Sequence, residues 1–364
     1  MKSVIRATVA SLAALAMAAG VAGCGASQEA TGKAGDKQVS VSMGLVLTGL
    51  KYFQEEKSGA EAFAAEDGNV DLEITGPPGF DPELAQKQVR DLLAKGPDAM
   101  GISPQPPDTW LRTMQELSTQ LRGNVIAYSE VPASTPKDVS RSPIRTVVGN
   151  DDRRLSREML EKTIKLSGLD KSTTGPVVLA PCTPDKTGTG ARRLAGFVDA
   201  VKELLPKTNI VTFVTTPTNR QENYELWADK LSAYPNAVLA AGTCGDDGNS
   251  LYRLKQKKGY KYALGAMELT PESLTGLKDG SILAVQTANT WVMGYTVARM
   301  LTLAARGEKL PEGFVATGGT LFTKDNADQG SVRDEQPEKF FRPVIDKLFA
   351  NGMPEAQPIE NAWK

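Results

Sequence analysis

The hydrophobic pattern of this chain alternates between short apolar runs and longer amphipathic runs. The run Val125–Tyr128 is typical of a buried strand, whereas Leu84, Val89 and Leu92 recur at nearly helical spacing. Strands are predicted at 39–47, 70–74, 99–102, 125–128, 177–180, 210–214, 237–241, 262–266 and 282–286. Helices are predicted at 52–66, 83–95, 108–121, 151–166, 191–205, 223–233, 250–258 and 270–277. This alternation predicts an α/β fold with parallel sheets flanked by helices.

The alternation occurs in two rounds, which are separated by the polar segment 132–143. A length of 364 residues is typical of about two domains. Two similar lobes predict a cleft between them, lined by loops at the carboxyl ends of the strands. The proline-rich loop 103–108 is expected to face this cleft, because prolines reduce the entropy lost on ligand binding. The alternative is a rigid turn without ligand contact.

The amino-acid composition argues against several classes of function. Hydrophobic residues make up 40% and charged residues 23%, as in ordinary soluble domains, and the formal net charge of −1 argues against a nucleic-acid partner. The chain has no histidine, which removes Ser-His-Asp and Cys-His catalysis and histidine metal sites. No P-loop, GxGxxG or CxxC motif is present, and no cofactor or metal is expected. The segment 188–190 precedes a helix and is either an anion site or a flexible loop.

The N-terminus indicates export. Lys2 and Arg6 precede the apolar segment 7–19, which has the length of a signal-peptide core. The tetrapeptide VAGC at 21–24 resembles a bacterial lipobox, so 1–23 is predicted as a signal peptide and Cys24 as the lipidated residue. Residues 24–38 are then a flexible tether, and the protein is lipid-anchored to the outer face of the bacterial cell membrane. The alternative is an ordinary signal peptide with a chance cysteine.

Six groups of residues occur in a characteristic order. They are Tyr52-Phe53 with 57–60, 92–99 with 102–104, 148–152, 193–197, 277–280 with 293–295, and 323–326. Together they resemble periplasmic-binding-protein-like solute receptors of the ribose- and galactose-binding type, which feed sugar ABC transporters. The resemblance covers about residues 40–330. It implies a two-lobed clamshell of periplasmic binding protein type I with three hinge crossings.

The resemblance also implies boundaries for the lobes. Lobe one would contain 39–131 and the return segment 290–312, and lobe two would contain 132–289. Residues 313–364 would supply the final strand of lobe two, a hinge segment and a C-terminal tail. In this fold the strands that precede Cys182 and Cys244 are neighbours, so these cysteines are predicted to form a disulfide near the cleft. The alternative is two buried free thiols.

Candidate ligand contacts follow from the same resemblance. Aromatic side chains pack on the C–H faces of sugars, and charged or amide side chains bind their hydroxyls. The candidates are Tyr52, Phe53, Asp81, Gln105, Ser129, Glu130, Arg192, Arg193, Asn219, Asp246, Asp247, Glu268 and Asn289. Arg192 and Arg193 are rivals for the cleft, and for Tyr52 and Phe53 the alternative is packing at a helix start.

Several candidate positions differ from the usual family pattern. Ser129 and Glu130 stand where many relatives have Asp-Arg, and 265–268 reads Gly-Ala-Met-Glu where relatives have Gly-Phe-Asp. The ligand is therefore expected to differ from ribose and galactose. Because many of the candidates are acidic, one hypothesis is a ligand that carries hydroxyls and a cationic group.

The function expected from these features is an extracytoplasmic solute-binding lipoprotein. It would capture a small polar ligand, a sugar or sugar-like molecule, and deliver it to an ABC import permease, acting as a monomer. One alternative is a ligand sensor for a membrane signalling partner. Another is a carboxylate-based glycan-processing enzyme, which needs two carboxylates at catalytic separation, one with a raised pKa.

Overall fold

The computed structural model describes residues 37–182, 188–217 and 219–363. The predicted signal peptide, Cys24 and most of the predicted tether lie outside these residues. The described residues belong to one compact unit, 34–364. Within them, no helix is both long enough and apolar enough to cross a membrane.

The first sheet has the strand order β11-β5-β4-β3-β1-β2, and its pairings are all parallel. The strands are β1 (Val39–Gly44), β2 (Val70–Thr75), β3 (Ala99–Ile102), β4 (Val125–Tyr128), β5 (Thr146–Gly149) and β11 (Gly313–Ala316). Parallel pairing brings the carboxyl ends of these strands to one edge of the sheet. Ser129 and Glu130, which follow β4, lie at this edge.

The second sheet has the order β12-β10-β9-β8-β6-β7. Its strands are β6 (Gly175–Ala180), β7 (Thr208–Thr212), β8 (Leu239–Gly242), β9 (Ala263–Met267), β10 (Ala284–Ala288) and β12 (Gly319–Phe322). Only the pairing of β10 with β12 is antiparallel. Thr243 and Glu268 directly follow β8 and β9, and Cys182 lies two residues after the end of β6.

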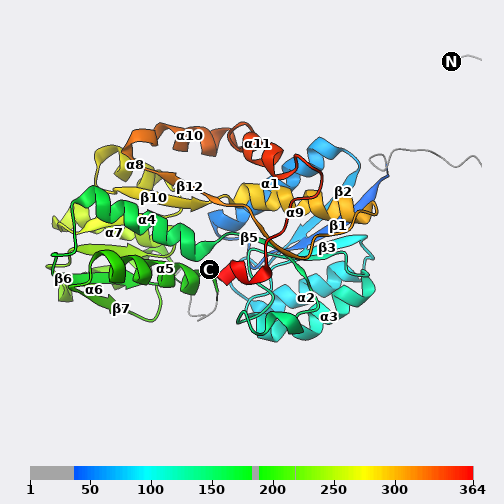
Figure 1. Cartoon of the computed structure of the whole chain (residues 1–364), viewed down its shortest axis with the longest axis horizontal. Helices are drawn as coiled ribbons and strands as arrows, with labels where there is room; N and C mark the ends of the chain where they lie inside the picture. The colour runs from blue at the N-terminus through cyan, green and yellow to red at the C-terminus, as the bar shows by residue number, and fades with distance from the viewer. Residues whose placement is uncertain (1–36, 183–187, 218, 364) are drawn as a thin grey trace, which may run out of the picture. The chain divides into compact units, whose positions relative to one another are not determined.

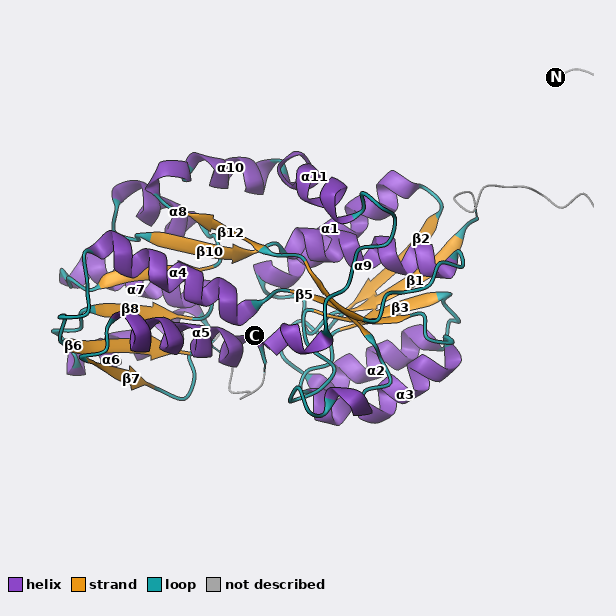
Figure 2. Ribbon diagram, viewed as in Figure 1, coloured by secondary structure: helices purple, strands orange, loops and turns teal. Residues whose placement is uncertain are grey.

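Helices cover both faces of each sheet (Figures 1 and 2). The helices of the first lobe are α1 (Lys51–Asp67), α2 (Pro82–Leu93), α3 (Leu111–Gln120), α9 (Thr290–Ala305) and α11 (Pro337–Leu348). Those of the second lobe are α4 (Asp152–Ser167), α5 (Thr189–Leu204), α6 (Arg220–Ala233), α7 (Gly245–Lys258), α8 (Pro271–Asp279) and α10 (Asp328–Glu335). The predicted α/β fold class with two parallel-stranded lobes is confirmed.

Each central strand contributes to two hydrophobic cores. In β4, Ile126 and Tyr128 pack with α1 and α9, whereas Val125 and Ala127 pack with α2 and α3. Side chains alternate between the two faces of a strand. A strand with helices on both faces is therefore apolar at every position, which is why β4 reads as a continuous apolar run.

Helices α1 and α9 approach each other closely through two glycines. A Cβ atom on Gly59 would lie 1.9 Å from the carbonyl oxygen of Trp291, and one on Gly294 would lie 1.8 Å from that of Glu56. Any larger residue at either position would force the two helices apart. This contact fixes the position of the first turn of α1, which carries Tyr52.

The predicted lobe boundaries need correction. The first lobe extends beyond residue 131, because β5 pairs in parallel with β4. The return segment extends beyond residue 312, because β11 pairs with β5 in the first sheet. The chain then crosses to β12, which is the predicted final strand of the second lobe. Strand β5 was missed because its short sequence was assigned to the connection between the lobes.

Candidate ligand-binding site

Predicted site residues from both lobes meet in one buried cluster. Ser129 and Glu130 follow β4, Glu268 follows β9, and Arg192 and Arg193 lie in the first turns of α5. Ser129 and Glu268 have φ angles of 62° and 64°, in the left-handed region that residues other than glycine rarely adopt. Such strained residues cluster at binding sites, and both lie where a strand turns sharply at the sheet edge.

Arg193 is at the centre of this cluster. Its Nε donates to Asp152 Oδ1 at 3.1 Å, and its Nη2 lies 2.7 Å from Glu268 Oε1. Its Nη1 donates to the carbonyl oxygen of Thr243 at 2.9 Å. The side chain is 2% exposed, so its charge is compensated by protein groups and not by water. Arg193 therefore fixes Asp152 and Glu268 relative to the end of β8.

Arg192 connects the two lobes. Its Nη2 donates to Asp152 Oδ2 at 2.9 Å and lies 3.5 Å from Glu130 Oε2. The hydroxyl of Thr189 also donates to Glu130 Oε1, at 2.9 Å. Burial raises the pKa of Glu130, although the Arg192 guanidinium favours its ionised form. Glu130 follows a strand of the first sheet, so these contacts join the first lobe to α5 of the second. Sequence reasoning left Arg192 and Arg193 as rivals, and the structure brings both into the cluster.

Tyr52 forms the aromatic side of the cluster. The guanidinium carbon of Arg193 lies 5.8 Å from the centre of its ring, within the range of a cation–π contact. The Asn150 side chain donates to the Tyr52 hydroxyl at 3.4 Å. Burial raises the pKa of Tyr52 well above its usual value. The ring thus lies beside charged groups of both lobes, as expected of a surface that binds a polar ligand.

Glu56 belongs to the same cluster and was missed by sequence reasoning. It lies one turn after Tyr52 on α1 and is fully buried. No described residue donates a hydrogen bond to either of its carboxyl oxygens. Burial raises its pKa well above the usual value, and the nearby carboxylates of Glu130 and Glu55 add to the shift. Glu56 could have been found as a charged residue on the apolar stripe of α1 that contains Phe53 and Ala60.

Four predicted contacts have local partners at helix N-termini, and their ligand contacts remain predictions. Asp81 and Asn219 are the N-cap residues of α2 and α6, and their side chains accept from backbone N–H groups. Asp247 is buried at the start of α7, where it accepts from Cys244 N, Asn223 and Trp227. Asp246 pairs with Arg220 at 3.1 Å. All four are of residue types that favour helix N-termini, so sequence alone does not separate this role from ligand binding.

Three further candidates make no hydrogen bond or ion pair with the described charged residues of the cluster. Phe53 is packed in the core of the first lobe. Gln105 is buried in the proline-rich loop, and its backbone oxygen accepts from Trp110 Nε1 at 3.3 Å. Asn289 lies where the chain returns to the first lobe, donating to the carbonyl oxygen of Thr317 and accepting from Thr320. Their predicted ligand contacts remain predictions.

Cys182 and Cys244 are joined by a disulfide, with their Cα atoms 5.8 Å apart. The bond links the end of β6 to the N-cap of α7. Between these elements, the Thr243 hydroxyl accepts from Cys182 N at 2.9 Å, while the Thr243 carbonyl oxygen holds Arg193. The disulfide therefore supports the loop that positions the central arginine of the cluster.

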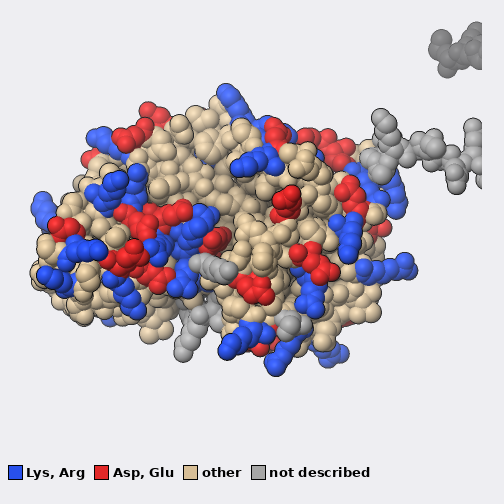
Figure 3. Space-filling model, in the orientation of Figure 1, with Lys and Arg blue, Asp and Glu red and all other residues tan. Residues whose placement is uncertain are grey.

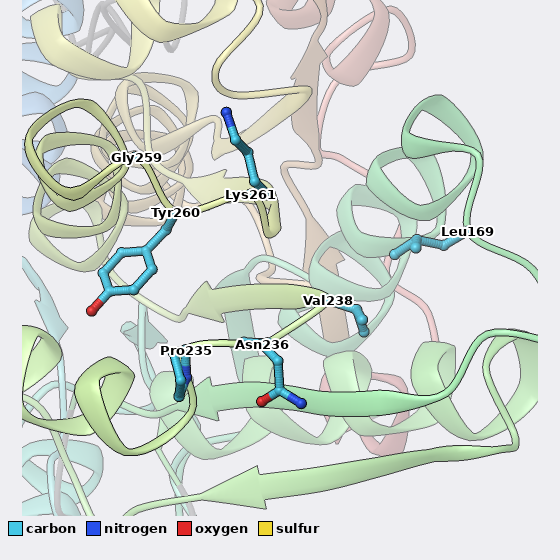
Figure 4. A pocket seen from close by; sticks show the side chains of 8 residues that line it. Leu169, Pro235, Asn236, Val238, Gly259, Tyr260 and Lys261 are labelled. Atoms are coloured by element: carbon cyan, nitrogen blue, oxygen red, sulfur yellow. The ribbon is translucent and has the colours of Figure 1, made fainter.

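A separate hollow lies on the described part of the second lobe. Leu169, Asn236, Val238, Tyr260 and Lys261 are among the residues that line this space of about 560 Å³ (Figure 4). Val238 lies one residue before β8 and Lys261 two residues before β9, so the hollow is at the amino-terminal edge of the sheet. The charged cluster is at the opposite, carboxyl edge, where ligands of parallel α/β sheets bind.

The outer surface carries charges of both signs. On the face shown in Figure 3, Lys and Arg side chains alternate with Asp and Glu, and no broad basic area appears there. On α4, for example, Arg154 pairs with Glu158 and Arg157 with Glu161. Within the described residues, no group of three or more Cys, Asp or Glu side chains is arranged to hold a metal ion.

Comparison with known proteins identifies the family. A sequence profile described as periplasmic binding protein domain matches residues 41–309. The chain belongs to this family of periplasmic binding proteins. Its members are solute-binding proteins rather than enzymes, in agreement with the absence of a predicted catalytic site. No curated protein sequence matched the chain.

Solved structures share the fold of this periplasmic binding protein. An ABC transporter solute-binding protein from Burkholderia graminis, in complex with D-arabinose, is 22% identical, covers 80% of this chain and 97% of its own, and has a TM-score of 0.68. A solute-binding protein from Agrobacterium vitis with bound D-fucose is 18% identical and has a TM-score of 0.71. The match covers 81% of this chain and 99% of that protein. A glucose-galactose binding protein from Geobacillus stearothermophilus is 19% identical and has a TM-score of 0.67. The match covers 80% of this chain and 99% of that protein.

Proposed function

We propose that this protein is an exported, lipid-anchored solute receptor that binds a sugar or sugar-like molecule between its lobes and delivers it to an ABC import permease. The observation that carries the proposal is the cluster formed by Tyr52 and Glu130 of the first lobe with Arg192, Arg193 and Glu268 of the second. Side chains from both lobes would contact one ligand, so binding would favour the closed arrangement.

The chemistry of the cluster supports a hydroxylated ligand. Buried carboxylates and guanidinium groups form strong, directional hydrogen bonds with hydroxyls, and an aromatic ring packs on the C–H face of a sugar. Solved relatives of the same fold contain D-arabinose and D-fucose, which supports the same ligand class here. The ligand would replace some of the contacts that now join the charged side chains to one another.

A thermal-shift screen of the protein without residues 1–24 tests this binding role. The panel contains pentoses, hexoses, polyols, amino sugars and nucleosides. A ligand at 100 times its dissociation constant should stabilise the folded protein by about 2.7 kcal/mol. Failure of every sugar and sugar-like compound to shift the unfolding temperature would contradict the proposed ligand class.

Two substitutions locate the binding site. Tyr52→Ala removes the aromatic side of the cluster and should weaken binding of the screening hit at least ten-fold by calorimetry. Asp81→Asn is the matched control, because asparagine caps a helix as well as aspartate does and Asp81 lies outside the cluster. Equal loss of affinity in both variants would place the ligand elsewhere.

Anchoring and delivery have separate tests. Cys24→Ser should move the protein from the membrane fraction to the soluble exported fraction, because lipidation requires the cysteine thiol. Deleting the gene should abolish uptake of the radiolabelled screening hit by the cells. Unchanged uptake, with loss of a transcriptional response to the same compound, would indicate the sensor role in place of transport.

A further inference from the structure

Among the residues that the structure describes, the charged cluster contains more acidic than basic groups. Among the described residues, Arg192 and Arg193 contact three carboxylates, those of Glu130, Asp152 and Glu268. Four of these five side chains are at most 7% exposed, and Glu268 is 18% exposed. In such a buried site a cationic group would stabilise the ionised form of the carboxylates, which burial otherwise disfavours, so the cluster favours a positively charged ligand.

Glu56 adds a further acidic group beside this cluster. Its side chain is 0% exposed, and neither carboxyl oxygen has a hydrogen-bond partner among the described residues. The Ser129 hydroxyl lies near enough to favour the ionised form, but Glu130 and Glu55 disfavour it. Ser103, at the carboxyl end of β3, also has a buried hydroxyl without a partner in the described part of the chain, and its side chain contributes to the environment of Tyr128.

Unpartnered buried polar groups are rare in native proteins because each loses its bonds to water and gains nothing in return. They persist where a ligand supplies the missing partner or where the group has another function. Glu56 lies one turn after Tyr52 on the same helix, and its charge raises the pKa of both Tyr52 and Tyr128, so it is near both rings. The unpartnered carboxyl is therefore next to the aromatic residue proposed to contact the ligand.

We infer that Glu56 is a specificity residue that selects a ligand carrying a protonated amine, such as an amino sugar. The ammonium group would donate to the Glu56 carboxylate, and the ligand hydroxyls would bond with Ser103 and Ser129. This inference rests on the proposed function, because it assigns the ligand class of the same site. A neutral sugar leaves the ionised form of Glu56 without a cationic partner, whereas an ammonium group supplies one.

Isothermal titration calorimetry at pH 7 with matched compounds tests the inference. D-Glucose and D-galactose are each compared with their 2-amino, 3-amino and 6-amino deoxy derivatives, so that the amine is presented at several positions of the ring. At least one amino derivative should bind ten-fold or more tightly than its parent sugar. Equal affinity within every pair would overturn the inference while leaving sugar binding, and thus the proposed function, intact.

Substitution assigns the preference to Glu56. Glu56→Gln keeps the shape of the side chain and removes its charge, so it should reduce the preference for the amine at least ten-fold. Glu61→Gln is the matched control on the same helix, because Glu61 is 57% exposed and pairs with Lys57 at the surface. An amine preference that persists in Glu56→Gln would overturn the assignment. Failure of every parent sugar and amino derivative to bind would overturn the inference, whereas the proposed sugar class is decided by the full thermal-shift panel.

Discussion

Glu56 occupies a position on α1 where the surrounding pattern favours an apolar side chain. Phe53, Ala60 and Phe63 lie on the same buried face of the helix. A carboxyl group that is buried without a partner favours its protonated form, because burial penalises charge. The raised pKa of Glu56 therefore makes folding stability depend on pH.

The sign of this pH dependence follows from the raised pKa. Glu56 contributes fully to stability below its pKa in the unfolded chain, and that contribution is lost as the pH rises through its higher pKa in the folded protein. Glu56→Gln removes the free-energy cost of ionising this buried carboxyl at high pH. The variant should exceed the parent protein in free energy of unfolding by about 1–3 kcal/mol at pH 8, with the difference shrinking toward pH 4.5.

Urea denaturation across this pH range, without ligand, measures the effect. The groups facing Glu56 include Glu55, Glu130, Tyr52 and Tyr128, and they remain unchanged in the variant. Glu61→Gln should have the same free energy of unfolding as the parent protein at every pH, since Glu61 is exposed. A constant difference between Glu56→Gln and the parent would show that Glu56 has no raised pKa.

At the scale of elements, the site depends on how the loops after β6 and β8 are held. The disulfide joins Cys182 to the N-cap of α7, and the capping box of Cys244 and Asp247 begins that helix. Helix α7 therefore begins at Gly245, before the predicted start at residue 250. Thr243 lies within this arrangement and binds Arg193, so a local helix start is coupled to the charged cluster.

Removing the disulfide should destabilise the protein and the site together. The bond closes a loop with a sequence separation of 62, for which chain entropy predicts about 4 kcal/mol of stabilisation. The double substitution Cys182→Ser and Cys244→Ser should lower the free energy of unfolding by about this amount. Chemical denaturation with and without a reductant provides the control, because the reductant should destabilise only the parent protein. An unchanged stability in the double variant would contradict the structural role of the bond.

At the scale of the whole described unit, the C-terminal helices connect the two lobes. Gly330 of α10 lies against Leu269 and Leu274 of the second lobe, whereas Phe341 of α11 stacks on Trp291 of α9 in the first. Arg333 is 2% exposed and lies 2.6 Å from Glu55 of α1. This segment therefore adds a connection beyond the three crossings between the sheets.

The connection can be tested by substituting its buried arginine. Arg333→Met leaves the carboxylate of Glu55 without its main partner, whose hydrogen bond holds the pKa of Glu55 low despite burial. Breaking a buried ion pair in this way should cost about 3–5 kcal/mol of stability. Arg342→Met is the control, because Arg342 pairs with Glu66 at the surface and should cost about 0–1 kcal/mol. Equal effects in thermal denaturation would contradict a special role for Arg333.

Most elements and the family of this protein can be predicted from its sequence. Strands β3 and β4 coincide with the predicted ranges, because residues buried on both faces of a sheet are apolar throughout. The order of short motifs along the chain indicated the two-lobed fold. The structure brings Tyr52, Glu130, Arg192, Arg193 and Glu268 into one cluster, and their ligand contacts remain predictions. The tether and Cys24 remain predictions.

Which polar residues belong to the site depends on tertiary packing. Asp81 and Asp247 resemble ligand contacts in sequence, but local backbone N–H groups engage them. Glu56 resembles an ordinary helix residue, yet packing buries it beside Tyr52. Helical and strand periodicity encode only local geometry, whereas Arg192 meets Glu130 across 62 residues and Arg333 meets Glu55 across 278. Such contacts depend on how the completed sheets and helices fit together, which no local pattern records.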